Sequence, residues 1–242
     1  MIPKSHPRYE SLKTRELLAE GIKKGITSLH GLIAHGRGEA FDYLIGEKTS
    51  KFAKKSIEAA ASLLLLAKHP SISVNGNAAA LVPKEIVELS KLINAKIEVN
   101  IFHASKQREI RIKNHLKKYG AKSVLLPDKK HKIRFLESNR KYVHPEGILK
   151  ADVVFVPLED GDRAEALVKN EKKVITIDLN PLSRTSQKAT ITIVDNITRA
   201  MPLLIKTIRQ YKLHNKNKLE KILKNYNSKK VLESALRTIR RS

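Results

Sequence analysis

The chain has 242 residues, 41% of them hydrophobic, and its 48 lysines and arginines outnumber 24 acidic residues, which gives a formal net charge of +24. That length is enough for a domain with a substantial buried core. The lack of cysteine excludes disulfides, thiol catalysis and zinc–cysteine sites. There is no run of about 18 apolar residues to suggest a membrane span, and the first residues have no apolar signal core, so we expect a cytoplasmic protein.

The excess of positive charge is compatible with two classes of partner. Lysine and arginine attract phosphate groups, so a non-enzymatic RNA-binding protein is one interpretation. The basic residues are spread over the whole chain, however, and aromatic residues make up only 5% of it. No RNA-recognition motif with interleaved aromatic residues is present. We therefore favour anionic small molecules as ligands and keep RNA as the alternative.

Helices and strands are expected to alternate along the chain. Apolar residues at helical spacing predict a helix over 8–24, ended by Gly25, and another over 49–68. Short β-branched runs predict strands at 71–75, 96–101, 123–127, 152–157, 173–179 and 190–195. Helical segments follow several of these strands, near 83–93, 106–119, 162–170 and from about 197. This order predicts an α/β, Rossmann-like fold in one domain over 1–242, with a largely parallel sheet covered by helices on both faces.

The segment 212–242 differs in composition from the rest of the chain. It contains ten basic and two acidic residues, a balance of 10 − 2 = +8. Two apolar stripes at helical spacing predict two amphipathic helices, which would pack on the body or on a partner subunit as a basic C-terminal extension. A surface that binds a phosphate polymer is the alternative interpretation.

Residues 31–49 read GLIAHGRGEAFDYLIGEKT and contain the most unusual local pattern. Gly36 and Gly38 permit positive φ and close approach of a ligand to the main chain. Arg37 between them has the fork geometry that suits phosphate or carboxylate. We expect a flexible glycine loop that binds an anionic small molecule, in which His35 either contacts the ligand or shapes the loop.

Polar clusters follow four of the predicted strands, at 75–77, 159–162, 178–180 and 195–196. In open α/β sheets, ligands bind beyond the carboxyl ends of the strands. Each cluster alone is compatible with a turn or a helix cap. Together they predict a nucleotide or acyl-phosphate pocket, with Asp178 placed to bind a ribose. The chain contains no P-loop, no complete GxGxxG, no HExxH and no GxSxG motif, which argues against common NTPases, dehydrogenases, zinc proteases and serine hydrolases.

Several long segments resemble the archaeal 4-phosphopantoate–β-alanine ligases, also called archaeal phosphopantothenate synthetases. They are IPKSHPRY (2–9), residues 31–49, SVNGNAAALVP (73–83), VPLEDGDRAEALV (156–168), DLNPLSRTS (178–186) and IVDNITRA (193–200). The resemblance implies a homodimeric, AMP-forming ligase of coenzyme A biosynthesis that uses ATP with Mg²⁺ and passes through an acyl-adenylate. The chain departs from the family pattern at His103 and Ala104, where the family has an aromatic residue and an arginine, and over 127–150.

The resemblance also implies roles for individual residues. It places ATP contacts at Arg15, Arg37, Asp178, Leu179, Asn180, Arg184, Thr185, Asn196 and Ile197. The arginines would neutralise the phosphates, Asp178 and Asn180 would bind ribose or adenine, and amides near Asn196 would bind phosphate at a helix N-terminus. Catalytic roles fall on Arg37 and His35, and the 4-phosphopantoate candidates are His35, Arg37, Asn75, Gly76 and Asn77. Glu159, Asp160 and Asp162 are candidates for Mg²⁺ or the β-alanine amine. A related ATP-dependent ligase acting on another carboxylate is the remaining enzymatic alternative.

Overall fold

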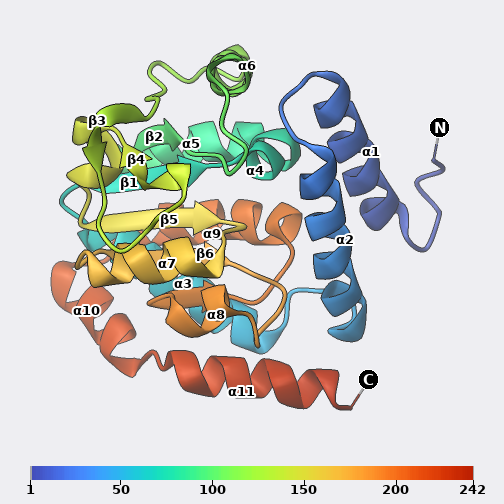
Figure 1. Ribbon diagram of the computed structural model, residues 1–242. Coiled ribbons are helices and arrows are strands. Elements are labelled where there is room, and N and C mark those ends of the chain that lie inside the picture. The colour runs from blue at the N-terminus through green and yellow to red at the C-terminus, as the bar shows by residue number, and fades with distance from the viewer. Residues whose placement is uncertain (1, 242) are drawn as a thin grey trace.

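A five-stranded parallel sheet forms the centre of the computed structural model, which describes residues 2–241 (Figure 1). The strand order is β2-β1-β5-β6-β7. The strands are β1 (Pro70–Val74), β2 (Lys96–Val99), β5 (Val153–Pro157), β6 (Lys173–Ile177) and β7 (Ile191–Ile193). Every residue of β1 and β5 is buried. This explains the continuous apolar run of β5, whereas β1 also buries two serines, Ser71 and Ser73. The predicted fold class is confirmed.

Helices cover both faces of the sheet, and the alternation along β5 shows how. Val153 and Phe155 belong to the main core with α3 (Lys51–Leu66), α5 (Pro83–Ile93) and α9 (Ile197–Tyr211), whereas Val154 and Val156 pack with α7 (Gly161–Lys169) on the other face. Successive side chains of a strand point to opposite faces, so one apolar run serves two cores. Helices α4 (Gly76–Leu81), α6 (Lys106–Lys118) and α8 (Arg184–Lys188) complete the helical layers.

The terminal segments are helical. At the N-terminus lie α1 (Tyr9–Lys23) and α2 (Leu29–Leu44), and at the C-terminus α10 (Lys216–Asn225) and α11 (Ser228–Ile239). Figure 1 shows α2 along one side of the molecule and α11 along its lower edge. Val231, Leu232 and Ala235 of α11 are buried against Phe52 and Ala53 of α3. The basic extension therefore packs on the body. No helix within residues 2–241 combines the length and apolarity needed to cross a membrane.

Two sequence predictions were wrong. Residues 123–127 are not a strand, and only Leu125 makes an isolated bridge, to Glu98. Beyond Pro127 the chain leaves the sheet to form an antiparallel pair, β3 (Asp128–Lys132) and β4 (Tyr142–Val143), with the short helices η1 (Asn139–Lys141) and η2 (Pro145–Leu149) around it. Proline lacks the N–H that would continue the ladder.

The glycine-rich stretch is the second correction, because residues 31–44 form most of helix α2 and not a loop. Gly36 and Gly38 are helical, while Gly46, just beyond the helix, has a φ of +84°. Ser28 caps the N-terminus by accepting a hydrogen bond from the Gly31 amide (3.3 Å). This cap and the glycine stop define the helix ends, and they offset part of the cost of about 1 kcal/mol for each internal glycine.

Candidate active site

A cavity of about 880 Å³ lies at the carboxyl edge of the sheet. Its floor is formed by the residues that follow three strands: 75–77 after β1, 158–161 after β5 and 178–180 after β6. Helix α2 forms one wall, with His35, Arg37 and Phe41 among its lining residues. Parallel strands end at a common edge, so polar residues far apart in the sequence meet here.

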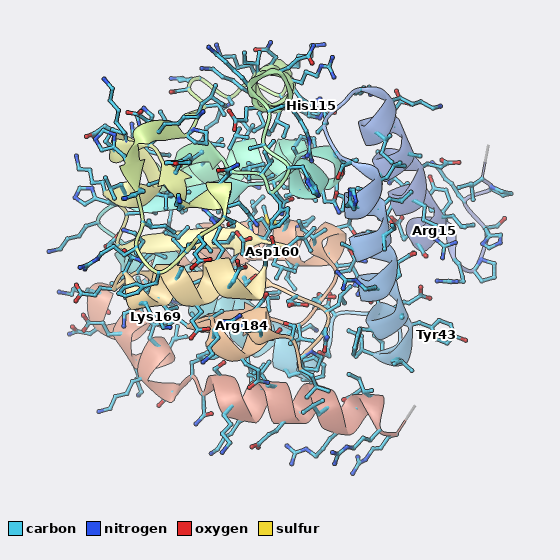
Figure 2. All side chains as sticks on the ribbon, viewed as in Figure 1. Arg15, Tyr43, His115, Asp160, Lys169 and Arg184 are labelled. Carbon is cyan, nitrogen blue, oxygen red and sulfur yellow. The ribbon has the colours of Figure 1, made fainter. Side chains whose placement is uncertain are left out.

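Most of the residues singled out from the sequence line this cavity: His35, Arg37, Asn75, Gly76, Asn77, Glu159, Asp160, Asp178, Leu179, Asn180, Arg184 and Thr185. Figure 2 shows Asp160 and Arg184 at the end of the sheet, with Arg15 apart from them on α1.

Four of the proposed contacts lie elsewhere in this single chain. Arg15 pairs with Glu39 of α2, with 2.9 Å between Nε and Oε2. Asp162 accepts a hydrogen bond from the Arg163 amide in the first turn of α7. Asn196 caps α9 by accepting from the Thr198 amide (3.1 Å), and Ile197 is 2% exposed in the core. The first turn of α9 is thus capped by the protein's own side chain.

Helix α2 is held against the body by a buried charge cluster. Arg199 of α9 pairs with Asp42 of α2 and with Asp195 after β7, at 2.7 Å between its Nη2 and the Asp195 Oδ1. The Asn196 amide group also donates to Asp42 (2.9 Å). Asp42 is the buried residue of α2, so the helix that carries Arg37 is attached by polar contacts more than by an apolar face.

The loop after β6 is held by its own hydrogen bonds and carries a half-buried carboxylate. Asp178 accepts hydrogen bonds from the Asn180 amide (2.9 Å) and from the Ser183 hydroxyl. Ser183 in turn caps α8 through the Ser186 amide (2.9 Å). Burial raises the pKa of Asp178, and these hydrogen bonds partly oppose the shift. Each oxygen keeps a second lone pair, so the carboxylate can still accept from a ligand hydroxyl.

Glu159 forms buried ion pairs within the protein, whereas the sequence suggested that it could bind Mg²⁺ or the β-alanine amine. Its side chain is fully buried and pairs with the guanidiniums of Arg140 and Arg163. Burial alone would raise the pKa of Glu159, but the two arginines hold it below the usual range. A carboxylate engaged on both oxygens by arginine is a poor metal ligand. Asp160 also pairs with Arg140 (Nη1–Oδ2 2.7 Å) but is 53% exposed.

The cations of the cavity differ in their partners. Arg37 is exposed on α2 and makes no ion pair with another residue within 2–241. Arg184 pairs with Glu165 (Nη2–Oε2 2.6 Å) while its side chain stays 60% exposed. Burial lowers the pKa of His35, whose Nε2 has no hydrogen-bond partner within residues 2–241. Arg37 is therefore available to a ligand, whereas His35 lines the cavity as a neutral imidazole with its Nε2 buried.

Sequence reasoning missed several residues that line the cavity: Ser28, His30, Phe102, His103, Arg108 and Arg140. Arg140 comes from the irregular 127–150 segment. Asn100, which follows β2, orients the Arg140 side chain by accepting a hydrogen bond from its Nε (2.9 Å). Phe102 and His103 directly follow the predicted strand 96–101, so a strand end could have indicated them. No strand end or local motif marks the other four positions, and only long-range packing reveals those.

The carboxyl edge of this parallel sheet forms a cavity lined by arginines, carboxylates and amides. In α/β proteins, this is the kind of site at which an anionic ligand such as a nucleotide binds. The family model described as phosphopantothenate/pantothenate synthetase matches residues 52–242, and the chain belongs to this family. The family resemblance predicted from the motifs is confirmed.

The relatives match nearly end to end. The chain is 53% identical over 242 residues to the 4-phosphopantoate–β-alanine ligase of Thermococcus kodakarensis, covering 99% of this chain and 92% of that protein. It is likewise 53% identical to the ligase of Thermococcus onnurineus, with the same coverage. The ligase of Methanosarcina mazei is 51% identical over 238 residues, covering 98% of this chain and 94% of that protein.

Proposed function

We propose that the protein is an ATP-dependent ligase that joins 4-phosphopantoate to β-alanine, releasing AMP and diphosphate and forming 4′-phosphopantothenate for coenzyme A biosynthesis in the cytoplasm. Relatives with this ligase name match almost the whole chain, and this observation carries the proposal. The cavity at the sheet edge supports it, because most of the expected contacts line it.

The reaction has two steps, and the cavity residues suit both. In the first, a carboxylate oxygen of 4-phosphopantoate attacks the α-phosphorus of ATP, and the bond to the diphosphate breaks. Arg37 and Arg184 would stabilise the charge on the leaving diphosphate, while Asp178 and Asn180 bind ribose or adenine. In the second, the β-alanine amine attacks the acyl carbon and AMP leaves. The neutral imidazole of His35 is suited to accept the amine's proton.

We expect Mg²⁺ to enter with the nucleotide. No group of three or more His, Asp or Glu side chains within residues 2–241 is arranged to hold a metal ion. Mg²⁺ commonly keeps water and phosphate ligands and takes only one or two carboxylates from a protein. Asp160, half-exposed at the cavity, is the carboxylate that we expect to contribute.

A homodimer through α2 is also part of the proposal. Leu29, Ile33 and Tyr43 are 67%, 66% and 64% exposed, and with Gly36 and Ala40 they form a stripe spaced by four and three residues. Figure 2 shows Tyr43 at the outer side of α2. Such spacing lets a helix pack against a copy of itself. Light scattering of the wild type should give twice the 27.3 kDa chain mass. Ile33→Lys should give the mass of a single chain, whereas the control Leu213→Lys, at another exposed leucine, should remain a dimer. A monomeric wild type would contradict the dimer.

An AMP-release assay tests the proposed reaction. AMP should form from ATP only when 4-phosphopantoate and β-alanine are both present. Turnover with a different acid would instead favour a related carboxylate–amine ligase. No nucleotide turnover, together with RNA binding that weakens steeply with salt, would favour the nucleic-acid alternative.

A further inference from the structure

The C-terminal helices α10 and α11 carry exposed basic residues that the proposed reaction does not use. Residues 212–241 contain ten basic and two acidic side chains, and none of them lines the cavity at the sheet edge. Of the ten, only Lys216 forms an ion pair within the described chain, with Glu220 (3.7 Å). Eight of the others form what we call the C-terminal basic face: Lys218, Lys221, Lys224, Lys229, Lys230, Arg237, Arg240 and Arg241.

Helical periodicity turns these residues away from the body of the protein. Val231 and Ala235 of α11 are buried against α3, and residues three, four or seven positions apart share one side of a helix. Lys230, Arg237 and Arg241 have this spacing on the other side of α11, and all three are exposed. In α10 the exposed lysines at 218, 221 and 224 follow each other at intervals of three. The cations therefore form a row along the lower edge of the molecule in Figure 1.

This row of like charges is unfavourable in the free protein. Lys229 and Lys230 lie in the first turn of α11, which has no acidic residue, although the helix dipole favours negative charge there. Lys218 and Lys221 are close enough along α10 to repel each other. On the surface of α7 and α8, by contrast, Glu165 pairs with three basic side chains. An anionic partner lying along the C-terminal basic face would remove the repulsion.

The packing of the two helices decides which anionic partner fits. A basic amphipathic helix binds an anionic membrane by inserting its apolar side, but in α11 that side is buried against Phe52 and Ala53. Single-stranded nucleic acids are bound by stacking bases on aromatic rings, and neither α10 nor α11 contains an aromatic residue. The exposed side chains of α11 are all charged, so none is suited to read a base edge or a ribose hydroxyl. A duplex bound only through its phosphates matches this surface.

The spacing of the cations also matches a duplex. From Lys229 to Arg241 the chain rises about 18 Å, at about 1.5 Å per residue. One strand of duplex DNA carries a phosphate about every 3.4 Å along the axis, so about five phosphates lie along this length. The C-terminal basic face supplies five cations over the same distance. We infer that this face binds double-stranded DNA through the phosphate backbone, without reading its sequence. The inference does not depend on the ligase reaction.

Fluorescence anisotropy with a short labelled DNA duplex of arbitrary sequence tests this binding on the full chain. For the wild type, the logarithm of the affinity should fall with the logarithm of the salt concentration with a slope of about −4 or steeper. Replacing Lys229, Lys230 and Arg237 together by glutamine should weaken binding about 10-fold or more and make the slope shallower by about 2 to 3. Glutamine keeps the helix propensity, so α11 should remain folded.

A matched control removes the same charge far from this face. Lys117, Lys118 and Lys122 are exposed at and after the end of α6, which Figure 1 shows at the upper edge of the molecule. Replacing these three by glutamine should leave the slope unchanged and the affinity within about twofold of wild type. Equal losses in the two triple variants would mean that only net charge matters and would overturn the inference.

Three further comparisons complete the test. Replacing the α10 lysines at 218, 221 and 224 by glutamine should also weaken duplex binding and make the slope shallower, and wild-type affinity in this variant and in the α11 variant would overturn the inference. Tighter binding to single-stranded DNA, duplex RNA or anionic lipid vesicles than to the DNA duplex would overturn it as well. All the variants should keep wild-type AMP release, since they leave the cavity intact. A wild type without AMP release would count against the proposed function alone.

Discussion

Replacing Glu159 by glutamine tests whether a buried ion-pair network holds the cavity wall. The side chains of Glu159 and Arg163 are 0% exposed, and that of Arg140 is 4% exposed. Glutamine conserves the volume but removes the charge that both guanidiniums face. Arg140 keeps Asp160 and Asn100, whereas the Ser73 hydroxyl is the remaining side-chain hydrogen-bond partner of Arg163 within the described chain. Breaking a buried pair costs about 3–5 kcal/mol, and we expect that loss here.

Guanidinium chloride unfolding of wild type and Glu159→Gln measures this loss of unfolding free energy. For a chain of this length, the same loss corresponds to a melting temperature lower by about 6–20 °C. Asp160→Asn is the matched control, because Asp160 pairs with the same Arg140 but is 53% exposed. An exposed pair contributes at most about 1 kcal/mol. A loss below about 1 kcal/mol for Glu159→Gln, or equal losses for both variants, would refute the reasoning.

Three further predictions address catalysis, packing and pH. Arg37→Ala should lower kcat/KM in the AMP-release assay by about 100-fold or more, because we propose that its unpaired guanidinium stabilises developing phosphate charge. Replacement of the exposed Lys48 by alanine should leave kcat/KM unchanged, and near-normal turnover of Arg37→Ala would exclude the role of Arg37. Gly31→Ala should lower the free energy of unfolding by about 1–3 kcal/mol, because the new Cβ would lie 2.4 Å from Asn77 Oδ1. Gly38→Ala should instead raise it by up to about 1 kcal/mol, because alanine favours the helix and its Cβ has room at 3.5 Å from Leu179 Cδ1. Burial raises the pKa of Glu98 from 4.5 to about 7, so the folded state holds its proton more tightly than the unfolded state. The stability that this proton contributes is complete below about pH 4.5 and is lost as pH rises toward 7, by about 3 kcal/mol. Urea unfolding across this range should show a shallower decline in Glu98→Gln, and identical slopes would contradict the shift.

The sheet and the floor of the cavity could be predicted because each depends on local pattern. Strands buried on both faces are mostly apolar, as Val153–Pro157 is along its whole length, and this pattern can be read without knowing which strands are neighbours. The carboxyl ends of parallel strands share one edge, so the clusters at 75–77, 159–160 and 178–180 had to converge once the strands were known.

The character of α2 could not be read from local propensity. Glycine disfavours helix, so Gly36 and Gly38 indicated a loop, but Ser28 and Gly46 define the ends and Arg199 anchors Asp42 from a distant helix. The failed strand at 123–127 has a similar cause. Its apolar residues suit a strand, yet only Leu125 bridges to the sheet edge before Pro127.

The sequence by itself determined the α/β class, the residue types at the strand ends and the family, because these follow from short-range patterns and from motifs in a conserved order along the chain. Only the tertiary structure decided which charges are available to a ligand. Glu159 is neutralised by Arg140, 19 residues away, and Arg108 reaches the cavity by bonding to Ile26, 82 residues away. Charge pairing depends on distances in space, and no spacing along the chain encodes those distances.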